Sequence, residues 1–208
     1  MIVIGMTGSI GMGKSTAAAY LRGLGIPVLD ADRVVHELYA GAAVPLIEAA
    51  FPGTTAGGVV DRVALGARVL GSPEAMKRLE AIVHPLVRAA EWRFLLAEQD
   101  KGTPLSILEI PLLFETGAGD LFDAVIVVSA SAEAQRERLL DRPGMTIEKL
   151  EAINARQMPD AEKRARADFV VDTGTGLEDS RRQIDAILKD IVTRPPLAYQ
   201  RWAALQDI

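Results

Sequence analysis

The feature that most constrains the fold of this chain is a glycine-rich turn near its amino terminus, Gly8–Ser15, which reads GSIGMGKS. The turn satisfies the pattern G-x-x-x-x-G-K-[ST]. It stands between an apolar run, Ile2–Met6, and a segment of helical spacing that begins near Lys14. In this pattern the glycines let successive backbone N–H groups curl around phosphate oxygens, and the following helix adds its positive end. Because the strand, loop and helix come in the required order, we predict a phosphate-binding loop for ATP and not an accidental glycine-rich turn.

The residue types in the loop indicate how the nucleotide is held. We expect the nucleotide to lie against Gly11, Met12, Gly13, Lys14, Ser15 and Thr16. Lys14 would reach the β- and γ-phosphates, and the hydroxyl of Ser15 would hold a Mg²⁺ ion that bridges them. ATP and Mg²⁺ are therefore the expected cofactors.

Nucleotide binding alone does not fix the reaction. A GTPase switch is disfavoured, because the one D-x-x-G match, Asp141–Gly144, ends a helical stretch and no N-K-x-D motif is present. A nucleotide-dependent regulator is a second alternative. The two classes differ in one activity: a kinase transfers phosphate from ATP to a small molecule in the absence of protein partners, and a regulator does not.

Short apolar runs alternate with longer helical stretches, as in a parallel sheet that helices cover on both faces. We expect an α/β fold with five strands, at Ile2–Met6, Ile26–Leu29, Leu105–Ile110, Ala124–Val128 and Phe169–Val171. The expected helices are Lys14–Leu24, Arg33–Tyr39, Pro73–Ile82, Pro85–Asp100, Ala132–Leu140, Ile147–Met158 and Glu178–Val192. Residues 1–208 form one domain in this interpretation, with a helical lobe inserted at about 40–100 and a second elaboration at about 139–167.

Composition narrows the class of protein. The 208 residues include no cysteine, which excludes a disulfide framework and a thiolate zinc site and fits the cytosol. A net charge of −5 argues against a nucleic-acid partner bound through a broad basic surface, and no run of apolar residues is long enough for a bilayer span. Small-molecule substrates and a monomer or weak homo-oligomer are expected. Two basic stretches, Arg136–Arg142 and Arg156–Arg166, fit either a phosphate clamp or a solvated helix face.

Three further segments are candidates for binding the phosphate acceptor, because ligands of such sheets lie beyond the carboxyl ends of the strands. Asp32, after the second strand, could accept a proton from a hydroxyl, or it could cap the helix expected from Arg33. His84, before Pro85, fits a capping or loop position. Pro111–Glu115, after the third strand, could be core or an apolar wall for the acceptor.

Taken together, these segments resemble the dephospho-coenzyme A kinase family. The resemblance spans about Ile4 to Leu177 and rests on Gly8–Thr16, Asp30–Asp32, Leu79–Val87, Pro111–Glu115, Gln157 with Glu162–Arg164, and Ala167–Asp172. It implies a P-loop kinase core like that of adenylate kinase, a helical lobe for the acceptor, and a lid at about 139–167. The implied reaction, the last step of coenzyme A synthesis, moves the ATP γ-phosphoryl group to the ribose 3′-hydroxyl of dephospho-coenzyme A.

The resemblance also implies roles for single residues. Asp32 matches the proposed base, Arg142 matches a lid arginine near the moving phosphate, and His84, Leu113 and Glu115 match acceptor-side positions. The chain departs from the usual family pattern at Ser9, Glu109, Pro143 and Thr173. The nearest rival is a nucleoside monophosphate kinase, which would share the loop, the metal and the lid arginines but not the Leu79–Val87 segment.

Overall fold

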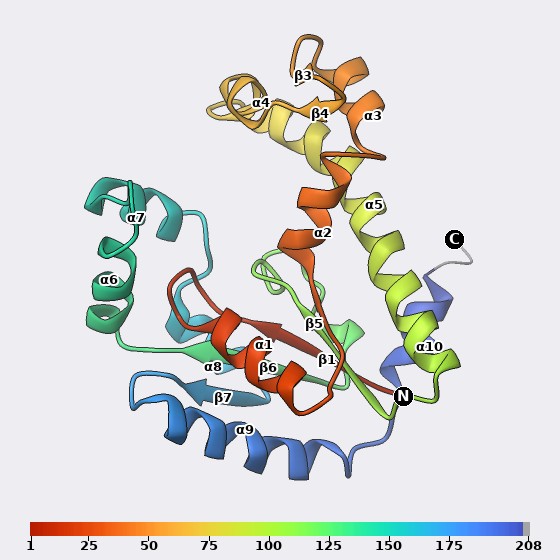
Figure 1. Cartoon of the computed structure of the whole chain (residues 1–208), viewed down its shortest axis with the longest axis vertical. Coiled ribbons are helices and arrows are strands. Elements are labelled where there is room, and N and C mark those ends of the chain that lie inside the picture. Colours follow the sequence, from red (N-terminus) through yellow and green to blue (C-terminus); the bar gives the residue numbers. More distant parts are fainter. Residues whose placement is uncertain (206–208) are drawn as a thin grey trace. The chain divides into compact units, whose positions relative to one another are not determined.

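A computed structural model describes residues 1–205 and divides the chain into two compact units (Figure 1). One unit, here called the sheet unit, contains Met1–Leu29 and the chain from Leu95 onward. The other, here called the small unit, is Asp30–Phe94. Among residues 1–205, no helix has both the length and the apolar character that a membrane crossing requires.

The sheet unit is built on a five-stranded sheet in the order β2-β5-β1-β6-β7. The pairs β1–β5, β1–β6 and β6–β7 are parallel, so the predicted α/β fold is confirmed. The strands are β1 (Ile2–Thr7), β2 (Val28–Asp30), β5 (Leu105–Glu109), β6 (Ala124–Ser129) and β7 (Phe169–Asp172). β2 begins two residues later than predicted. All five predicted runs therefore became strands of one sheet, with β1 at its centre.

Alternate residues of the central strand serve two different layers. Ile2, Ile4 and Met6 belong to one buried apolar cluster with Leu21 of α1 (Lys14–Gly23) and Ile184 of α9 (Leu177–Ile191). The residues between them face the opposite layer. Because every residue of β1 is buried, the strand has the continuous apolar sequence expected of a strand covered on both faces.

The remaining helices of the sheet unit are short. They are α6 (Ala132–Leu140), α7 (Ile147–Asn154), α8 (Asp160–Arg166), α10 (Ala198–Ala204) and a 3₁₀ turn, η1 (Gly119–Leu121). The bounds of α6 agree with the prediction, and α7 ends earlier than predicted. Neither α8 nor α10 was predicted, because seven residues are too few for helical spacing to show.

The small unit contains α2 (Ala31–Leu38), α3 (Val44–Ala50), α4 (Arg62–Val69) and the first part of α5 (Pro73–Asp100). Between α3 and α4 lies a β-hairpin, β3 (Thr55–Ala56) and β4 (Val59–Val60), which was predicted only as a turn-rich stretch. Its two turn residues, Gly57 and Gly58, have φ of +60° and +80°. A two-residue hairpin of this type needs positive φ at both positions, and glycine adopts it without strain. The expected lobe at about 40–100 thus contains helices and one hairpin, and its role in binding the acceptor stays a prediction.

The prediction of two helices, Pro73–Ile82 and Pro85–Asp100, is wrong. A single helix, α5, runs from Pro73 to Asp100 with Pro85 inside it. A proline there removes one backbone hydrogen bond and costs about 3 kcal/mol. Leu79 and Val83 before the proline and Leu95 after it are all buried, so packing on both sides outweighs that cost. His84 therefore lies exposed in mid-helix, and it neither caps nor opens a helix.

The same helix buries an ionisable group, and this generates a prediction. Burial raises the pKa of Glu91 from 4.5 to about 7, although Arg88 at 4.0 Å opposes the shift. A carboxyl group with a raised folded pKa stabilises the fold below its unfolded pKa and loses that contribution as the pH rises through about 7. We expect Glu91→Gln to raise the free energy of unfolding at pH 8 by up to about 3 kcal/mol, with little change at pH 4.5.

Urea denaturation of both proteins at pH 4.5, 6 and 8 measures this difference. Glu80→Gln, an exposed position on the same helix, is the matched control and should parallel wild type. A constant difference between Glu91→Gln and wild type across this range would contradict the prediction.

Candidate active site

The loop between β1 and α1 has a shape that only its glycines permit. A Cβ atom on Gly8 would lie 2.2 Å from the backbone oxygen of Val128 in β6, so no other residue fits there. Gly13, the N-cap of α1, has φ of +92°, a left-handed conformation that side chains disfavour. The predicted order of strand, loop and helix is therefore confirmed. The N–H groups of Thr16 and Ala17 donate to the Gly13 oxygen, so α1 begins directly at the loop, and a helix start in this position favours an anion.

Lys14, in the first turn of α1, lies over this loop. Its ammonium donates hydrogen bonds to the backbone oxygens of Gly8 at 2.7 Å and Ser9 at 3.2 Å. Ser15 and Thr16 follow in the same turn and are exposed, whereas Met12 is buried and its sulfur accepts from the N–H of Ala130. The structure thus brings the six predicted nucleotide residues together on one loop and helix start.

Two residues that the sequence analysis did not select brace the loop from one side. The Thr173 hydroxyl, just after β7, donates to the Met12 oxygen at 2.8 Å. Arg138, from α6, donates to the Thr173 hydroxyl at 2.9 Å, to the Thr173 oxygen at 2.6 Å and to the Gly11 oxygen at 3.4 Å. A guanidinium holds such a set of acceptors because its donors lie in a fixed plane. The sequence signal was present, since Arg138 belongs to the basic stretch Arg136–Arg142 and Thr173 departs from the family pattern.

Two glutamines hold the tip of the loop at Ile10. The Gln135 amide, from buried α6 surface, donates to the Ile10 oxygen at 2.7 Å. The Gln157 side chain accepts from the Ile10 N–H at 3.3 Å. Gln135 lies in α6 and Gln157 lies between α7 and α8, so two separate parts of the insertion between β6 and β7 contact the same loop residue.

Arg142, the predicted lid arginine, follows α6 and is exposed. Its backbone N–H bonds to the Leu139 oxygen, and the turn continues through Pro143 to Gly144, where φ is +75°. Its side chain projects from the insertion and does not take part in the bracing of the loop by Arg138. The role of Arg142 on the moving phosphate stays a prediction.

On the acceptor side, the capping interpretation of Asp32 is wrong. α2 begins at Ala31, and its N-cap is Asp30, whose carboxylate accepts from the Arg33 N–H at 3.1 Å. Asp32 lies in the first turn of α2, so the two carboxylates do not share one face of an extended chain as predicted. Because Asp30 does the capping, the helix does not need Asp32 for that purpose.

Leu113 and Glu115, which follow β5, occupy different environments. Leu113 is fully buried and packs so closely on β1 that a Cβ atom on Gly5 would lie 2.5 Å from its Cδ1 atom. Glu115 accepts from the Lys163 ammonium at 2.9 Å and from the Met158 N–H at 2.8 Å. The neighbouring Leu112, not Leu113, is exposed. Both predicted acceptor contacts stay predictions, as does that of His84 in the small unit.

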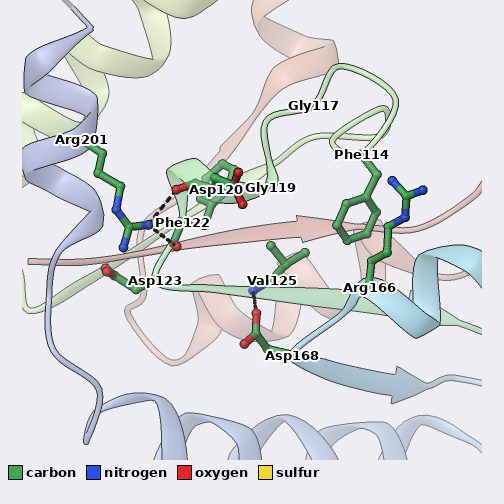
Figure 2. Close-up of a pocket in the computed structure, with 10 residues that line it drawn as sticks. All are labelled: Phe114, Gly117, Gly119, Asp120, Phe122, Asp123, Val125, Arg166, Asp168 and Arg201. Carbon is green, nitrogen blue, oxygen red and sulfur yellow. Dashed lines mark hydrogen bonds between the residues drawn. The ribbon is translucent and has the colours of Figure 1, made fainter.

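A pocket of about 880 Å³ in the sheet unit is lined by Phe114 of the Pro111–Glu115 segment but by none of the residues predicted to bind the nucleotide (Figure 2). Several of its polar groups hold the fold together. Asp168 accepts from the Val125 N–H, and Arg201 donates to the backbone oxygens of Asp120 and Phe122. Asp123 accepts from the N–H groups of Val3, Leu197 and Ala198. These groups satisfy strand ends and a helix start, so the phosphate loop is the better candidate site.

The bracing of the loop generates a prediction about Arg138. We expect Arg138→Met to weaken ATP binding roughly tenfold, because the Gly11 oxygen and Thr173 lose a charged hydrogen-bond donor. Isothermal titration calorimetry with ATP measures the change in Kd. Arg136→Met is the control, since Arg136 is exposed on the same helix and should leave the Kd unchanged. Equal Kd values for the two variants would show that the brace is not needed for nucleotide binding.

Comparisons with known proteins place the chain in a family. The sequence profile of the dephospho-CoA kinase family matches residues 2–179. The dephospho-CoA kinase of Mesorhizobium japonicum is 59% identical over 92% of this chain and 97% of its own. That of Brucella melitensis is 55% identical over 95% of this chain and 99% of its own.

Solved structures agree. The Thermus thermophilus protein TT1252 superimposes with a TM-score of 0.80 at 40% identity, over 91% of this chain and 97% of its own. The dephospho-CoA kinase from Campylobacter jejuni superimposes with a TM-score of 0.60 at 27% identity, over 91% and 96%. With a braced phosphate loop, the expected five-stranded sheet and relatives matched over nearly their whole length, this chain belongs to the dephospho-CoA kinase family.

Proposed function

We propose that this protein transfers the γ-phosphoryl group of ATP to the 3′-hydroxyl of the ribose of dephospho-coenzyme A, giving coenzyme A and ADP. The observation that carries the proposal is the match of this chain, over more than nine-tenths of its length, to proteins named dephospho-CoA kinase. The phosphate loop supplies the ATP side of the reaction, because a kinase family uses ATP as its phosphoryl donor.

On the donor side, the backbone N–H groups of Gly11–Thr16 bind the phosphates, and Lys14 neutralises charge on the β- and γ-phosphates as the bond breaks. The ammonium already lies within the loop, at 2.7 Å from the Gly8 oxygen, so little reorganisation is needed. Arg142 supplies a second cation from the insertion. Its planar fork suits the equatorial oxygens of the moving phosphoryl group.

The donor set fits Mg²⁺. Within residues 1–205, no three acidic, histidine or cysteine side chains form a cluster that could hold a metal by themselves. Mg²⁺ usually takes most of its ligands from phosphates and water, with few from protein, and the exposed hydroxyl of Ser15 follows Lys14 where such a ligand belongs. Ser15 would hold the ion, which would offset the negative charge of the ATP phosphates during the transfer.

On the acceptor side, Asp32 accepts the proton of the attacking hydroxyl. Its position supports this, because it follows the carboxyl end of β2 and Asp30 has taken over the capping of α2. His84, Leu113 and Glu115 contribute to the binding of dephospho-coenzyme A, His84 from α5 and the other two from the segment after β5.

The protein acts on small molecules as a monomer or weak homo-oligomer in the cytosol, where ATP is supplied. A single chain carries every residue proposed for the site, and the absence of cysteine fits a reducing compartment. Light scattering on the eluting protein tests the oligomeric state.

The decisive experiment compares acceptors. With ATP and Mg²⁺, we expect kcat/KM for dephospho-coenzyme A to exceed that for AMP, UMP, CMP and adenosine by at least about a hundredfold. The remote pantetheine arm explains the difference, because its binding energy holds the ribose hydroxyl in line with the γ-phosphate. Phosphorus NMR of the product should show the new phosphate at the 3′ position. Comparable rates with AMP would instead place the activity among the nucleoside monophosphate kinases.

The role of Asp32 is tested by Asp32→Asn, which keeps the size of the side chain and removes its basicity. We expect kcat to fall by at least about a hundredfold, the usual contribution of a general base. The free energy of unfolding should change by less than about 1 kcal/mol, because Asp32 is exposed and is not the cap of α2. The control is Asp61→Asn, since Asp61 caps α4 in the same unit and its change should leave kcat intact. Survival of kcat in Asp32→Asn would rule out Asp32 as the base.

A further inference from the structure

Lys163, in α8, is a fully buried cation of the sheet unit with 0% of its side chain exposed. Its ammonium contacts the Glu115 carboxylate at 2.9 Å and donates to the Pro111 oxygen at 3.2 Å. Burying a charge is costly unless paired groups surround it, so such a residue persists only in a well-defined arrangement. The two contacts of Lys163 lie at the two ends of one segment, Pro111–Glu115.

The Pro111 oxygen connects this segment to the phosphate loop. It also accepts from the Thr7 hydroxyl at 3.1 Å, and Thr7 is a fully buried residue that directly precedes Gly8. One carbonyl oxygen therefore ties together the end of β1, the end of β5 and α8. A shift of Pro111–Glu115 would therefore disturb the hydrogen bond to Thr7, the residue before the phosphate loop.

α8 itself is fixed to the sheet at a second point. The Asp160 carboxylate, in its first turn, accepts from the Ser129 hydroxyl at the end of β6 at 2.8 Å. The Met158 N–H, just before the helix, donates to Glu115 at 2.8 Å. Lys163 thus extends from a helix that Asp160 anchors to β6, and its ammonium contacts the segment after β5.

We propose that Lys163 is a positioning residue: its buried ammonium fixes Pro111–Glu115 at a set distance from the phosphate loop, and so places the acceptor in line with the transferred phosphate. This inference rests on the proposed function for its acceptor, dephospho-coenzyme A. Lys163 acts through Pro111 and Glu115, since its own ammonium has no exposed surface for a ligand. A displacement of about 1 Å between reacting groups lowers a rate by about a hundredfold.

The first test is Lys163→Met, which keeps most of the length of the side chain and removes its charge. We expect hydrogen exchange of residues 111–118 in the free protein to become faster, because both ends of the segment lose an anchor. We expect kcat/KM for dephospho-coenzyme A to fall by about a hundredfold while the Kd for ATP stays within about threefold of wild type. Lys101→Met is the matched control, since Lys101 pairs with Glu98 at 2.6 Å but is 66% exposed, and neither readout should change.

A second variant, Glu115→Gln, keeps an oxygen for the Met158 N–H and the Lys163 ammonium but removes the negative charge that pairs with Lys163. It should shift both readouts in the same direction, by less than Lys163→Met does. The variant with both substitutions should be no worse than Lys163→Met alone, because both changes act on one ion pair. If Lys163→Met does not fold, Glu115→Gln replaces it in the same measurements.

Three results would overturn the inference: unchanged hydrogen exchange at 111–118, faster exchange with unchanged kcat/KM, or an equal loss in ATP affinity. Additive losses in the double variant would also overturn it, because Glu115 would then act independently of Lys163. Failure of the proposed function gives a different result. Wild type itself would then not phosphorylate dephospho-coenzyme A, whereas the exchange experiment would still report whether Lys163 anchors the segment.

Discussion

The structure depends on one constraint: a phosphate loop offers its N–H groups to the ligand, so its carbonyl oxygens must find donors elsewhere in the protein. Each carbonyl oxygen from Gly8 to Gly13 has one here. Lys14 serves the first two, and Gln135, Arg138 and Thr173 serve the next three in chain order. The Gly13 oxygen accepts from the first turn of α1. These hydrogen bonds support the curled form of the loop from three elements, α1, α6 and the end of β7.

The topology of the sheet explains how donors so distant in sequence reach this loop. β1 is central and β6 and β7 follow it on one side, so the segments after these strands emerge beside the loop at the same edge. Thr173 comes after β7, and Arg138 comes from the helix after β6. On the other side of β1, the segment after β5 reaches the same edge through the contact between Thr7 and Pro111. Because the strands are parallel, the segments that follow β5, β6 and β7 all lie at the edge of the sheet where the phosphate loop begins.

The sequence predicted the five strands, the phosphate loop and both bounds of α6, because apolar runs and a glycine pattern are local signals. It failed where distant packing decides. Pro85 suggested a helix start, but buried side chains on both sides of it keep α5 continuous. Asp32 suggested a cap, but α2 begins two residues earlier than predicted, which moves the cap to Asp30. The roles of Arg138 and Lys163 were not visible, because a buried cation and a solvated one look alike in a charge-rich helix.

The structure distinguishes buried from solvated cations in the two basic stretches, Arg136–Arg142 and Arg156–Arg166. Neither the phosphate clamp nor the solvated face describes them fully: Arg136, Arg164 and Arg166 are exposed, whereas Arg138 and Lys163 turn inward. The two inward cations belong to the insertion that separates β6 from β7, and they fix it at two points, Arg138 to the phosphate loop and Lys163 to the segment after β5. Arg142 lies between them, just past α6, so any closure that brings it onto a phosphate must take place between two fixed points. A short, doubly anchored insertion limits where its arginine can go, and a precise phosphoryl transfer requires that limit.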